Sequence, residues 1–379
     1  MLTNPAPANR IVNMNDRLCI RNGRLVLRDR IEKNKSLFIE NGKIIAIANK
    51  TKAPSKEFEV IDARNLHVSA GFIDIHAHGL FADRIGRLEE DDLRRMCDQM
   101  AKAGVTAFLA TTVSFPTQAL LKATNTAKSF VKNNPDSNLL GLHLEGPYLN
   151  PSARGAQNNN YLRIFKATDL KKIISAGDGL IKMMTFAPEC QNGLKLLAFL
   201  VKRGIVPAIG HSQATYKEVK ECAKKGLKHV THLFNAIPGF DHSEPGLIGA
   251  ALNSKKLTFD IIADGIHVHP ASIKFVIKNK GVDGVILISD NVRKMRLPDG
   301  RLAGSVLNLN QAVKNIMKFA DIDLHDALKM VTINPAKLLG IQDRKGSLRV
   351  GKDADIVIFD DNLKVKYTIV KGNIITPLS

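Results

Sequence analysis

The feature that most constrains the fold is an alternation of eight short apolar runs with helix-like stretches through the middle of the chain. The runs are Val68–Ile75, Val105–Thr111, Leu139–Glu145, Ile181–Ala187, Ile205–Gly210, Val230–Phe234, Leu257–Ala263 and Val285–Ser289. The helix-like stretches include Glu89–Ala103, Thr117–Lys132, Leu194–Arg203 and Thr215–Lys225. Strands buried on both faces form continuous apolar runs, and strands that alternate with helices build parallel sheets. Eight such units predict an α/β protein with a (β/α)8 barrel of the TIM type.

Short strand-like runs also lie at both ends of the chain. They are Arg17–Ile20, Arg24–Leu27, Ser36–Ile39, Lys43–Ala48, Phe58–Ile61, Asp355–Phe359 and Lys364–Val370. Asn22-Gly23 and Asn41-Gly42 predict tight hairpin turns, and Lys371-Gly372-Asn373 predicts a further turn. We expect both ends to build one small β-sandwich domain, with residues 1–67 and 345–379 flanking a barrel of residues 68–344. The two ends could instead form separate pieces.

The net charge of +19, from 55 basic and 36 acidic residues, allows two interpretations. A basic surface can attract an anionic partner, such as a phosphorylated metabolite or a nucleic acid. It can also be a solvated, lysine-rich surface, which we favour because the lysines are spread along the chain without a basic block. No basic patch with interleaved aromatic residues indicates nucleic-acid binding. Steering of an anionic small molecule remains the second interpretation.

The four cysteines, Cys19, Cys97, Cys190 and Cys222, lack the close pairs of a zinc module and the density of a secreted disulfide scaffold. We therefore expect free thiols in a reducing cytoplasm. The polar segment Met1–Arg10 has no apolar core of a signal peptide. No apolar run approaches the about 20 residues that span a bilayer, so no membrane association is expected.

Metal-type ligands occur at the ends of five predicted strands. In a barrel of this kind, active sites lie at the carboxyl ends of the strands. His76 and His78 are two residues apart, so they point to the same side of an extended segment and can reach one ion. Imidazole and carboxylate are the ligands of zinc, iron and other first-row divalent metals. The candidate site residues are His76, His78, Glu145, His211, His232 and Asp290.

Each of these signals is weak alone, because a His-x-His pair is often structural and a strand-end aspartate such as Asp290 is often a helix N-cap. The joint pattern is stronger, since five separate strand ends would have to supply such ligands by accident. The other histidines are more readily structural: His67, His143, His229, His242, His269 and His325. His267 follows the seventh strand and is expected to line the pocket.

Several segments together resemble the amidohydrolase superfamily and, within it, the N-acetylglucosamine-6-phosphate deacetylases. The resemblance covers nearly the whole chain. Leu144-Glu145-Gly146-Pro147 and the Thr-His-Leu-Phe-Asn-Ala stretch of 231–236 are specific to this branch. The segments that carry it are 71–79, 141–148, 210–212, 231–236, 244–250, 262–267, 334–337 and 346–355.

The resemblance implies a divalent metal cofactor, zinc or iron, with one or two ions bound. Glu145, His211 and His232 would hold the ion that all members keep. His76 and His78 would hold a second, with Glu145 bridging. The metal would lower the pKa of a bound water toward about 7. Asp290 would act as general base toward that water and then as general acid toward the leaving amine.

The implied substrate is a small-molecule amino sugar phosphate, converted from N-acetylglucosamine 6-phosphate to glucosamine 6-phosphate and acetate. Asn235 and Ala236 would contact the sugar phosphate. Gln157 stands where many relatives have a histidine that polarises the substrate carbonyl, and it can still donate a hydrogen bond. The remaining pocket-lining residues would be Ala156, His267, Leu302, Ala303 and Gly304. The resemblance also suggests a homodimer.

Two further departures affect the phosphate. Ser243 stands where the family usually has an arginine that reaches the sugar phosphate, often that of the neighbouring subunit, and serine cannot make that bidentate contact. The chain after Asp290 is also short. One hypothesis is that Arg293, Lys294 and Arg296 bind the anion instead; the alternative is a solvated basic loop.

Three classes of function remain open. One is the deacetylase, acting on this or another N-acetyl amino sugar. Another is a non-catalytic or regulatory relative that binds such a sugar, although retention of all six candidate residues argues against it. The last is a different amidohydrolase reaction on an N-acyl amino acid or a cyclic amide, which the Leu-Glu-Gly-Pro segment disfavours.

Overall fold

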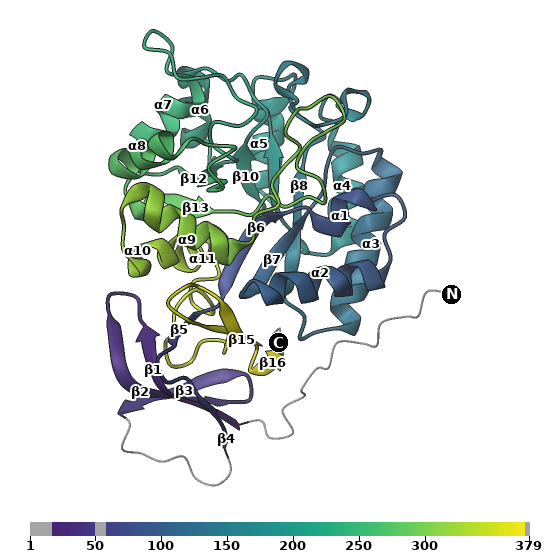
Figure 1. Ribbon diagram of the computed structural model, residues 1–379. Coiled ribbons are helices and arrows are strands. Elements are labelled where there is room, and N and C mark those ends of the chain that lie inside the picture. The colour runs from purple at the N-terminus through teal and green to yellow at the C-terminus, as the bar shows by residue number, and fades with distance from the viewer. Residues whose placement is uncertain (1–16, 50–57, 376–379) are drawn as a thin grey trace.

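The computed structural model describes residues 17–49 and 58–375. The polar segment Met1–Arg10, in which no signal peptide is expected from the sequence, lies outside these residues. Two eight-stranded sheets organise the described chain. In Figure 1 the larger, helix-covered body lies above a smaller sheet that contains strands from both ends of the chain.

The larger sheet is a nearly closed parallel barrel with strand order β13-β12-β11-β10-β9-β8-β7-β6. Its strands are β6 (Phe72–Ala77), β7 (Val105–Thr111), β8 (Leu139–Glu145), β9 (Ile181–Phe186), β10 (Val206–Ile209), β11 (His229–Val230), β12 (Thr258–Ile261) and β13 (Val285–Leu287). The first and last strands are joined beyond the ladder by the backbone N–H of Asp290, which donates to the carbonyl of His76 at 2.9 Å. The prediction of an eight-stranded parallel barrel is confirmed.

Helices surround the barrel and bury their apolar faces against it (Figure 1). The capping box of α6, in which Thr215 and Glu218 bond each other's backbone N–H groups, shows how the sequence starts these helices. The helices are α1 (Gly79–Asp83), α2 (Glu90–Lys102), α3 (Thr117–Asn133), α4 (Ala167–Gly177), α5 (Gly193–Val201), α6 (Tyr216–Lys224), α7 (Gly246–Asn253), α8 (Pro270–Lys280), α9 (Leu309–Ala320), α10 (Leu324–Lys329) and α11 (Ile333–Leu338). Short 3₁₀ turns are η1 (Pro151–Ala153), η2 (Asn159–Tyr161) and η3 (Val282–Gly284).

The second sheet is mixed and unites the two ends of the chain. Its order is β16-β15-β14-β5-β1-β2-β3, with β4 paired to β1. The antiparallel pairing of β14 with β5 joins the C-terminal strands to the N-terminal ones, so they do not form separate pieces. The strands are β1 (Arg17–Val26), β2 (Ile31–Glu40), β3 (Lys43–Asn49), β4 (Glu59–Asp62), β5 (His67–Ala70), β14 (Ile356–Phe359), β15 (Val365–Val370) and β16 (Asn373–Ile375).

The prediction of a hairpin at Asn22-Gly23 is wrong. The prediction of a hairpin at Asn41-Gly42 is confirmed, because this pair joins the antiparallel strands β2 and β3. Asn22 has a positive φ of 65° but lies inside the continuous strand β1, at a shift of register with β2. β1 pairs with β4 before this irregularity and with β5 after it. A Cβ on Gly23 would lie 2.5 Å from a methyl of Val68. The Asn-Gly pair therefore makes a bulge that lets one strand serve two neighbours.

Two predicted barrel strands also differ from the structure. The run Val68–Ile75 divides between β5 of the mixed sheet and β6 of the barrel, with Gly71 between them. The run Val230–Phe234 keeps strand geometry only at its start, because the backbone turns to positive φ at His232 and Phe234. The turn at His232 belongs to the candidate site described below.

All four cysteines are free thiols, as predicted, and only Cys190 is more than slightly exposed. In the described part of the chain, no helix combines the length and hydropathy needed to cross a membrane.

Candidate metal centre

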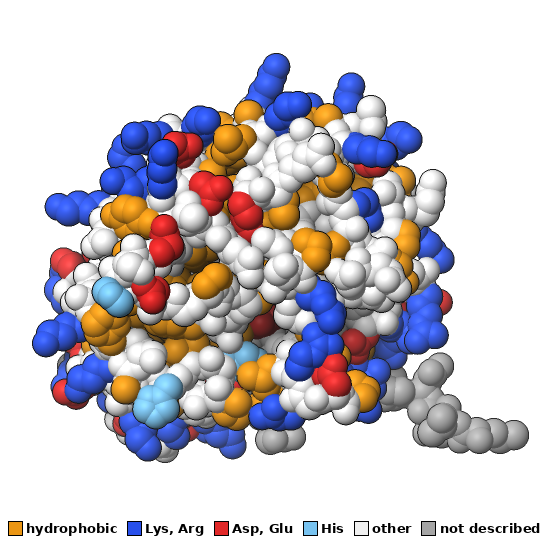
Figure 2. Space-filling model, turned by 90° about the horizontal axis from the view of Figure 1, so that it is seen from above, with side chains coloured by type: hydrophobic (Ala, Val, Ile, Leu, Met, Phe, Trp, Pro, Cys, Tyr) orange, Lys and Arg blue, Asp and Glu red, His pale blue; other side chains and the backbone are white. Residues whose placement is uncertain are grey.

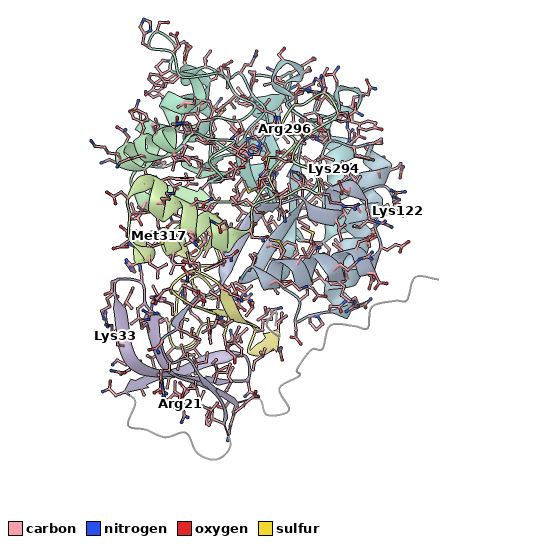
Figure 3. All side chains as sticks on the ribbon, viewed as in Figure 1. Arg21, Lys33, Lys122, Lys294, Arg296 and Met317 are labelled. Atoms are coloured by element: carbon pink, nitrogen blue, oxygen red, sulfur yellow. The ribbon has the colours of Figure 1, made fainter. Side chains whose placement is uncertain are left out.

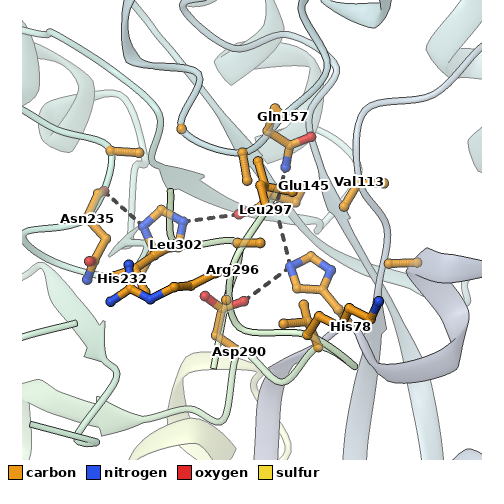
Figure 4. Close-up of a pocket in the computed structure, with 18 of the residues that line it drawn as sticks. His78, Val113, Glu145, Gln157, His232, Asn235, Asp290, Arg296, Leu297 and Leu302 are labelled. Carbon is orange, nitrogen blue, oxygen red and sulfur yellow. Dashed lines mark hydrogen bonds and ion pairs between the residues drawn. The ribbon is translucent and has the colours of Figure 1, made fainter. Parts of the chain in front are cut away.

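The six side chains singled out at the strand ends meet at one end of the barrel. Figure 4 shows four of them: His78, Glu145, His232 and Asp290. The Nε2 atoms of His76 and His78 are 3.2 Å apart. Glu145 Oε1 lies 3.2 Å from His211 Nε2 and 3.1 Å from His232 Nε2. All of these side chains are buried. The convergence expected from the sequence is therefore present in the structure.

These atoms form two groups that share Glu145. One contains His76, His78 and Glu145, and the other contains Glu145, His211 and His232. The closest contacts within the groups, from 3.1 to 3.5 Å, match the edge of about 3.3 Å of a tetrahedral shell with metal–nitrogen bonds near 2.05 Å. The donor set of imidazoles and one carboxylate suits zinc, iron or a similar divalent ion. Such paired clusters are consistent with a binuclear metal site.

Hydrogen bonds from the backbone select the histidine tautomer that a metal requires. The Nδ1 atoms of His78, His211 and His232 donate to the carbonyls of Thr111, Ala153 and Asn235 at 3.1 to 3.2 Å. Because each Nδ1 carries the proton, the lone pair of the neutral ring is on Nε2, which faces Glu145. His76 Nδ1 alone has no partner among the described residues. Three of the four rings are thus oriented for ligation by contacts outside the cluster.

Unusual backbone conformations place three of the six side chains. His211, His232 and Asp290 have positive φ values of 50°, 32° and 44°. Non-glycine residues rarely adopt this region, and such positions cluster at functional sites. Gly304 packs against the backbone of Asp290, where a Cβ would lie 2.8 Å from the Asp290 carbonyl oxygen. The turn at each strand end therefore aims the side chain into the barrel mouth.

Two buried carboxylates that were absent from the sequence-based candidates hold these strand ends. Asp74 Oδ1 accepts from the backbone N–H groups of His76 and Ser289 at 3.2 and 3.4 Å. Asp260 accepts from the backbone N–H of His232 and, at 2.9 Å, from His229 Nε2. An aspartate inside a fully buried apolar strand is the sequence signal that could have identified both.

The remaining histidines take structural places or sit outside the cluster. His143 is buried, donates from Nδ1 to the Ile75 carbonyl and packs its ring edge-on to His76 at 4.7 Å. His269 caps the N-terminus of α8. His67, at the start of β5 in the mixed sheet, bonds Asp361, and His242 is exposed. A surface group of Asp323, His325 and Asp326 is engaged elsewhere, since Asp323 caps α10.

The charges of the cluster shift the pKa values of its members in opposite directions. Burial lowers the pKa of His76 well below its ordinary value. For His232, burial is outweighed by the hydrogen bond and charge of Glu145, and the pKa rises to about 9. For Glu145, burial is outweighed by His76 and His211, so the pKa falls well below the usual range. The Glu145 carboxylate is thus paired with a protonated histidine, His232, and a metal ion would take the place of that positive charge.

Asp290 stands beside the first group. Its Oδ1 lies 3.2 Å from His78 Nε2 and 3.5 Å from His76 Nε2. The hydrogen bond with Asp290 and the charge of Glu145 outweigh burial and raise the pKa of His78. A carboxylate at this position can exchange a proton with a molecule held between the two groups.

A pocket of about 630 Å³ opens over the cluster. In Figure 2 this face is hollowed, with acidic and histidine side chains deep in the hollow and Lys and Arg side chains at its edge. Every residue predicted to contact substrate lines this pocket: Ala156, Gln157, Asn235, Ala236, His267, Leu302, Ala303 and Gly304. Ser243 does not line it; its hydroxyl donates to the Asp241 carboxylate on the exposed surface.

Two pocket residues carry polar atoms that have no partner within the described chain. They are the side-chain nitrogen of Asn235 and Nε2 of His267. Asp264 holds the His267 ring from the other side through a 2.7 Å contact with Nδ1. Buried polar atoms without partners are rare, so these two are available to a ligand.

Comparisons with known proteins agree with this geometry. The sequence model of the Amidohydrolase family matches residues 67–375. The chain is 34% identical to N-acetylglucosamine-6-phosphate deacetylase of Bacillus subtilis, over 95% of this chain and 98% of that protein. The crystal structure of the Thermotoga maritima N-acetylglucosamine-6-phosphate deacetylase superposes with a TM-score of 0.85 at 32% identity, covering 95% of this chain and all of that one.

A further structure shares the fold at lower identity. It is a mutant of the Mycobacterium smegmatis N-acetyl-D-glucosamine-6-phosphate deacetylase in complex with N-acetyl-D-glucosamine-6-phosphate. It superposes with a TM-score of 0.87 at 24% identity and covers 96% of this chain and all of that one.

Proposed function

The chain belongs to the amidohydrolase family, and on that premise we propose that it removes the acetyl group from N-acetylglucosamine 6-phosphate. The products are glucosamine 6-phosphate and acetate. The observation that carries the proposal is the meeting of two histidine groups at one shared carboxylate, Glu145, with Asp290 3.2 Å from His78.

The proposed ligands follow from the two groups. His211 and His232 with Glu145 hold one divalent ion, and His76 and His78 with Glu145 hold a second. When bound, these ions supply a Lewis acid and make a water molecule acidic enough to react at neutral pH. The oriented Nε2 lone pairs and the ligand-like spacing of the donor atoms support this assignment.

Asp290 moves the proton in the proposed reaction. It accepts a proton from the water that attacks the acetamide carbonyl carbon. It then delivers that proton to the leaving nitrogen as the carbon–nitrogen bond breaks. One water is consumed: acetate keeps its oxygen, the amine keeps the proton that Asp290 carried, and the second proton of the water is released when the acid product ionises to acetate. The position of Asp290 beside His78 and at the pocket wall supports this role.

The sugar is proposed to bind through the polar atoms that the protein leaves unpaired. Asn235 Nδ2 donates to a sugar or phosphate oxygen, and His267 Nε2 accepts from a sugar hydroxyl, because the ring donates from Nδ1 to Asp264. Gln157 donates to the substrate carbonyl or to Glu145. Ala156, Ala236, Leu302, Ala303 and Gly304 complete the wall.

The wider setting is proposed from the sequence. We propose a homodimer in the cytoplasm. We also propose the division expected from the sequence, a barrel of residues 68–344 and a β domain of residues 1–67 and 345–379, with its first boundary moved to the end of β5 because that strand pairs in the mixed sheet. Sedimentation equilibrium measures the oligomeric state, and a monomer at micromolar concentration would refute the dimer.

The experiment that tests the function is an acetate-release assay on protein whose metal content has been measured. N-acetylglucosamine 6-phosphate, N-acetylgalactosamine 6-phosphate, their unphosphorylated forms and an N-acetyl amino acid form the panel. We expect the first to have the highest kcat/KM, and an Asp290→Asn variant to lose activity while keeping its metal. Binding of these sugars without acetate release would instead support the non-catalytic alternative.

A further inference from the structure

The loop after Asp290 is an ordered hairpin at the pocket mouth. We call residues 291–304 the rim loop. Ala303 donates its backbone N–H to the Met295 carbonyl at 2.8 Å, and Leu297 donates to Arg301 at 2.9 Å. The hairpin is therefore held by its own backbone.

Arg301 anchors the rim loop to the opposite side of the mouth. Its guanidinium pairs with Asp299 and donates to the Gly155 carbonyl at 2.7 Å. Gly155 and Gln157 belong to the loop on the other side of the pocket. This arginine is committed to structure and is not available to a ligand.

Three other basic side chains of the rim loop line the pocket: Arg293, Lys294 and Arg296. Arg293 lies 3.7 Å from Asp83. Within residues 17–49 and 58–375, neither Lys294 nor Arg296 has a carboxylate at ion-pair distance. Arg296 makes one hydrogen bond, to the Gly300 carbonyl, so most of its five N–H donors remain free.

The charge of the pocket is divided between its floor and its mouth. Its acidic lining residues are Glu145 and Asp290, which contact the histidines, and Asp83, which faces Arg293. Lys294 and Arg296 thus leave an unbalanced positive charge at the mouth. In the view of Figure 4 the Arg296 side chain extends toward His232 and Asn235.

We infer that Lys294 and Arg296, assisted by Arg293, form a subsite for the phosphate monoester of the substrate within a single chain. This inference rests on the proposed function, because the acetamide must lie at the histidine cluster for the phosphate to reach the mouth. A guanidinium fork matches phosphate oxygens, and a lysine adds a point charge. The segment around Ser243 supplies no basic side chain to the pocket. We therefore assign the binding of the phosphate to the basic side chains of the rim loop.

The first test compares two substrates across charge-matched double variants. Lys294→Gln/Arg296→Gln removes two charges at the mouth. Lys33→Gln/Lys122→Gln removes two exposed charges far from it, in the mixed sheet and on the outer helix α3 (Figure 3). The substrates are N-acetylglucosamine 6-phosphate and N-acetylglucosamine. Each is assayed for KM and kcat with the metal-loaded protein.

We expect the mouth variant to raise KM for the phosphorylated sugar at least about tenfold, with kcat nearly unchanged. Its kcat/KM for the unphosphorylated sugar should equal that of the native chain, and the control should match the native chain on both. An equal effect on both sugars, or no effect on either, overturns the subsite.

The second test separates the subsite from the proposed reaction. Glucose 6-phosphate carries the phosphate but no acetamide, and its binding is measured by calorimetry. We expect about tenfold weaker binding to the mouth variant than to the control variant. If no sugar releases acetate but this difference appears, the subsite stands and the proposed function falls. If acetate is released equally well from both N-acetyl sugars, deacetylation stands, whereas the preference for the phosphorylated sugar and the subsite fall.

Discussion

Gln157 donates from Nε2 to Oε2 of Glu145 at 2.6 Å, so the loop at the pocket wall is tied to the carboxylate that both histidine groups share. Its orientation is fixed, because Gln157 Oε1 accepts from the backbone N–H of Ser114 at 2.7 Å. The amide can therefore present only a donor to the cluster. Gln157 therefore links the Ser114 backbone to Glu145 and restrains the position of that carboxylate.

Replacing Gln157 with leucine should lower kcat about 10- to 100-fold, because the donor that positions Glu145 is lost and, in the proposed reaction, so is a donor to the substrate carbonyl. KM should change much less. Steady-state kinetics on metal-loaded protein measure the split. A Gln157→His variant, which restores a donor, should recover part of kcat; a leucine variant with native kcat would contradict the role.

Replacing Asp290 with asparagine should lower kcat by about 10²- to 10⁴-fold, since the amide cannot accept the proton of the attacking water. The metal content should stay near that of the native chain, because the histidines and Glu145 are retained. Elemental analysis and acetate release on one preparation test both. An active variant would remove Asp290 from the proposed proton transfer.

Metal binding to the stripped protein should release protons at pH 7. His232 has a pKa raised to about 9 in the metal-free cluster, so it is protonated at pH 7, and ligation requires the neutral ring. Roughly one proton should leave from this residue, and affinity should rise about tenfold per pH unit up to pH 9. Calorimetry in buffers with different ionisation enthalpies measures the release; a heat independent of the buffer would contradict it.

Replacing Asp260 with alanine should destabilise the fold by about 2–4 kcal/mol, because two buried donors lose their acceptor. They are the His232 backbone N–H and His229 Nε2. Metal affinity should fall about 10- to 100-fold, since His232 is no longer held. Urea unfolding and metal titration measure both. Asp91→Ala, at an exposed position of α2, is the control and should cost less than about 0.5 kcal/mol.

Acid should weaken the junction at the mixed sheet. Asp353 contacts Lys43, Arg344 and Lys345, and these cations outweigh burial to hold its pKa at about 2. The folded pKa lies below the unfolded one, so the contribution is complete above about pH 4 and is lost toward pH 2. It should be about 1–2 kcal/mol, reduced because Lys43 and Arg344 are exposed. An Asp353→Asn variant unfolded by urea between pH 2 and 6 should lack this slope.

The barrel was predictable because its signal is local and repeated. Val105–Thr111 and Leu139–Glu145 match β7 and β8 to the residue, since a strand buried on both faces needs an unbroken apolar run. The six candidate side chains followed from the rule that strand ends meet. The positive φ angles at His211, His232 and Asp290 were not predictable, because sterics disfavour them and only tertiary contacts hold them.

The mixed sheet was harder to predict because its pairing is non-local. Asn22-Gly23 has the composition of a hairpin turn. It forms a bulge instead, because β1 pairs with β4 before it and with β5 after it. Asp74 and Asp260 were missed because a strand pattern shows that they are buried, and not which N–H groups they accept from. The rim loop was identified by its charges, and its anchoring through Arg301 became evident only in three dimensions.

The pairing of β5 with β14 has a consequence for biosynthesis. β5 is made early, whereas β14 begins at Ile356, near the end of the chain. Until the ribosome has released that last stretch, one edge of β5 has no neighbour and can recruit strands from other chains. The mixed sheet can close only after the whole barrel has been synthesised. Its N-terminal strands are therefore made before the barrel but complete their pairing after it.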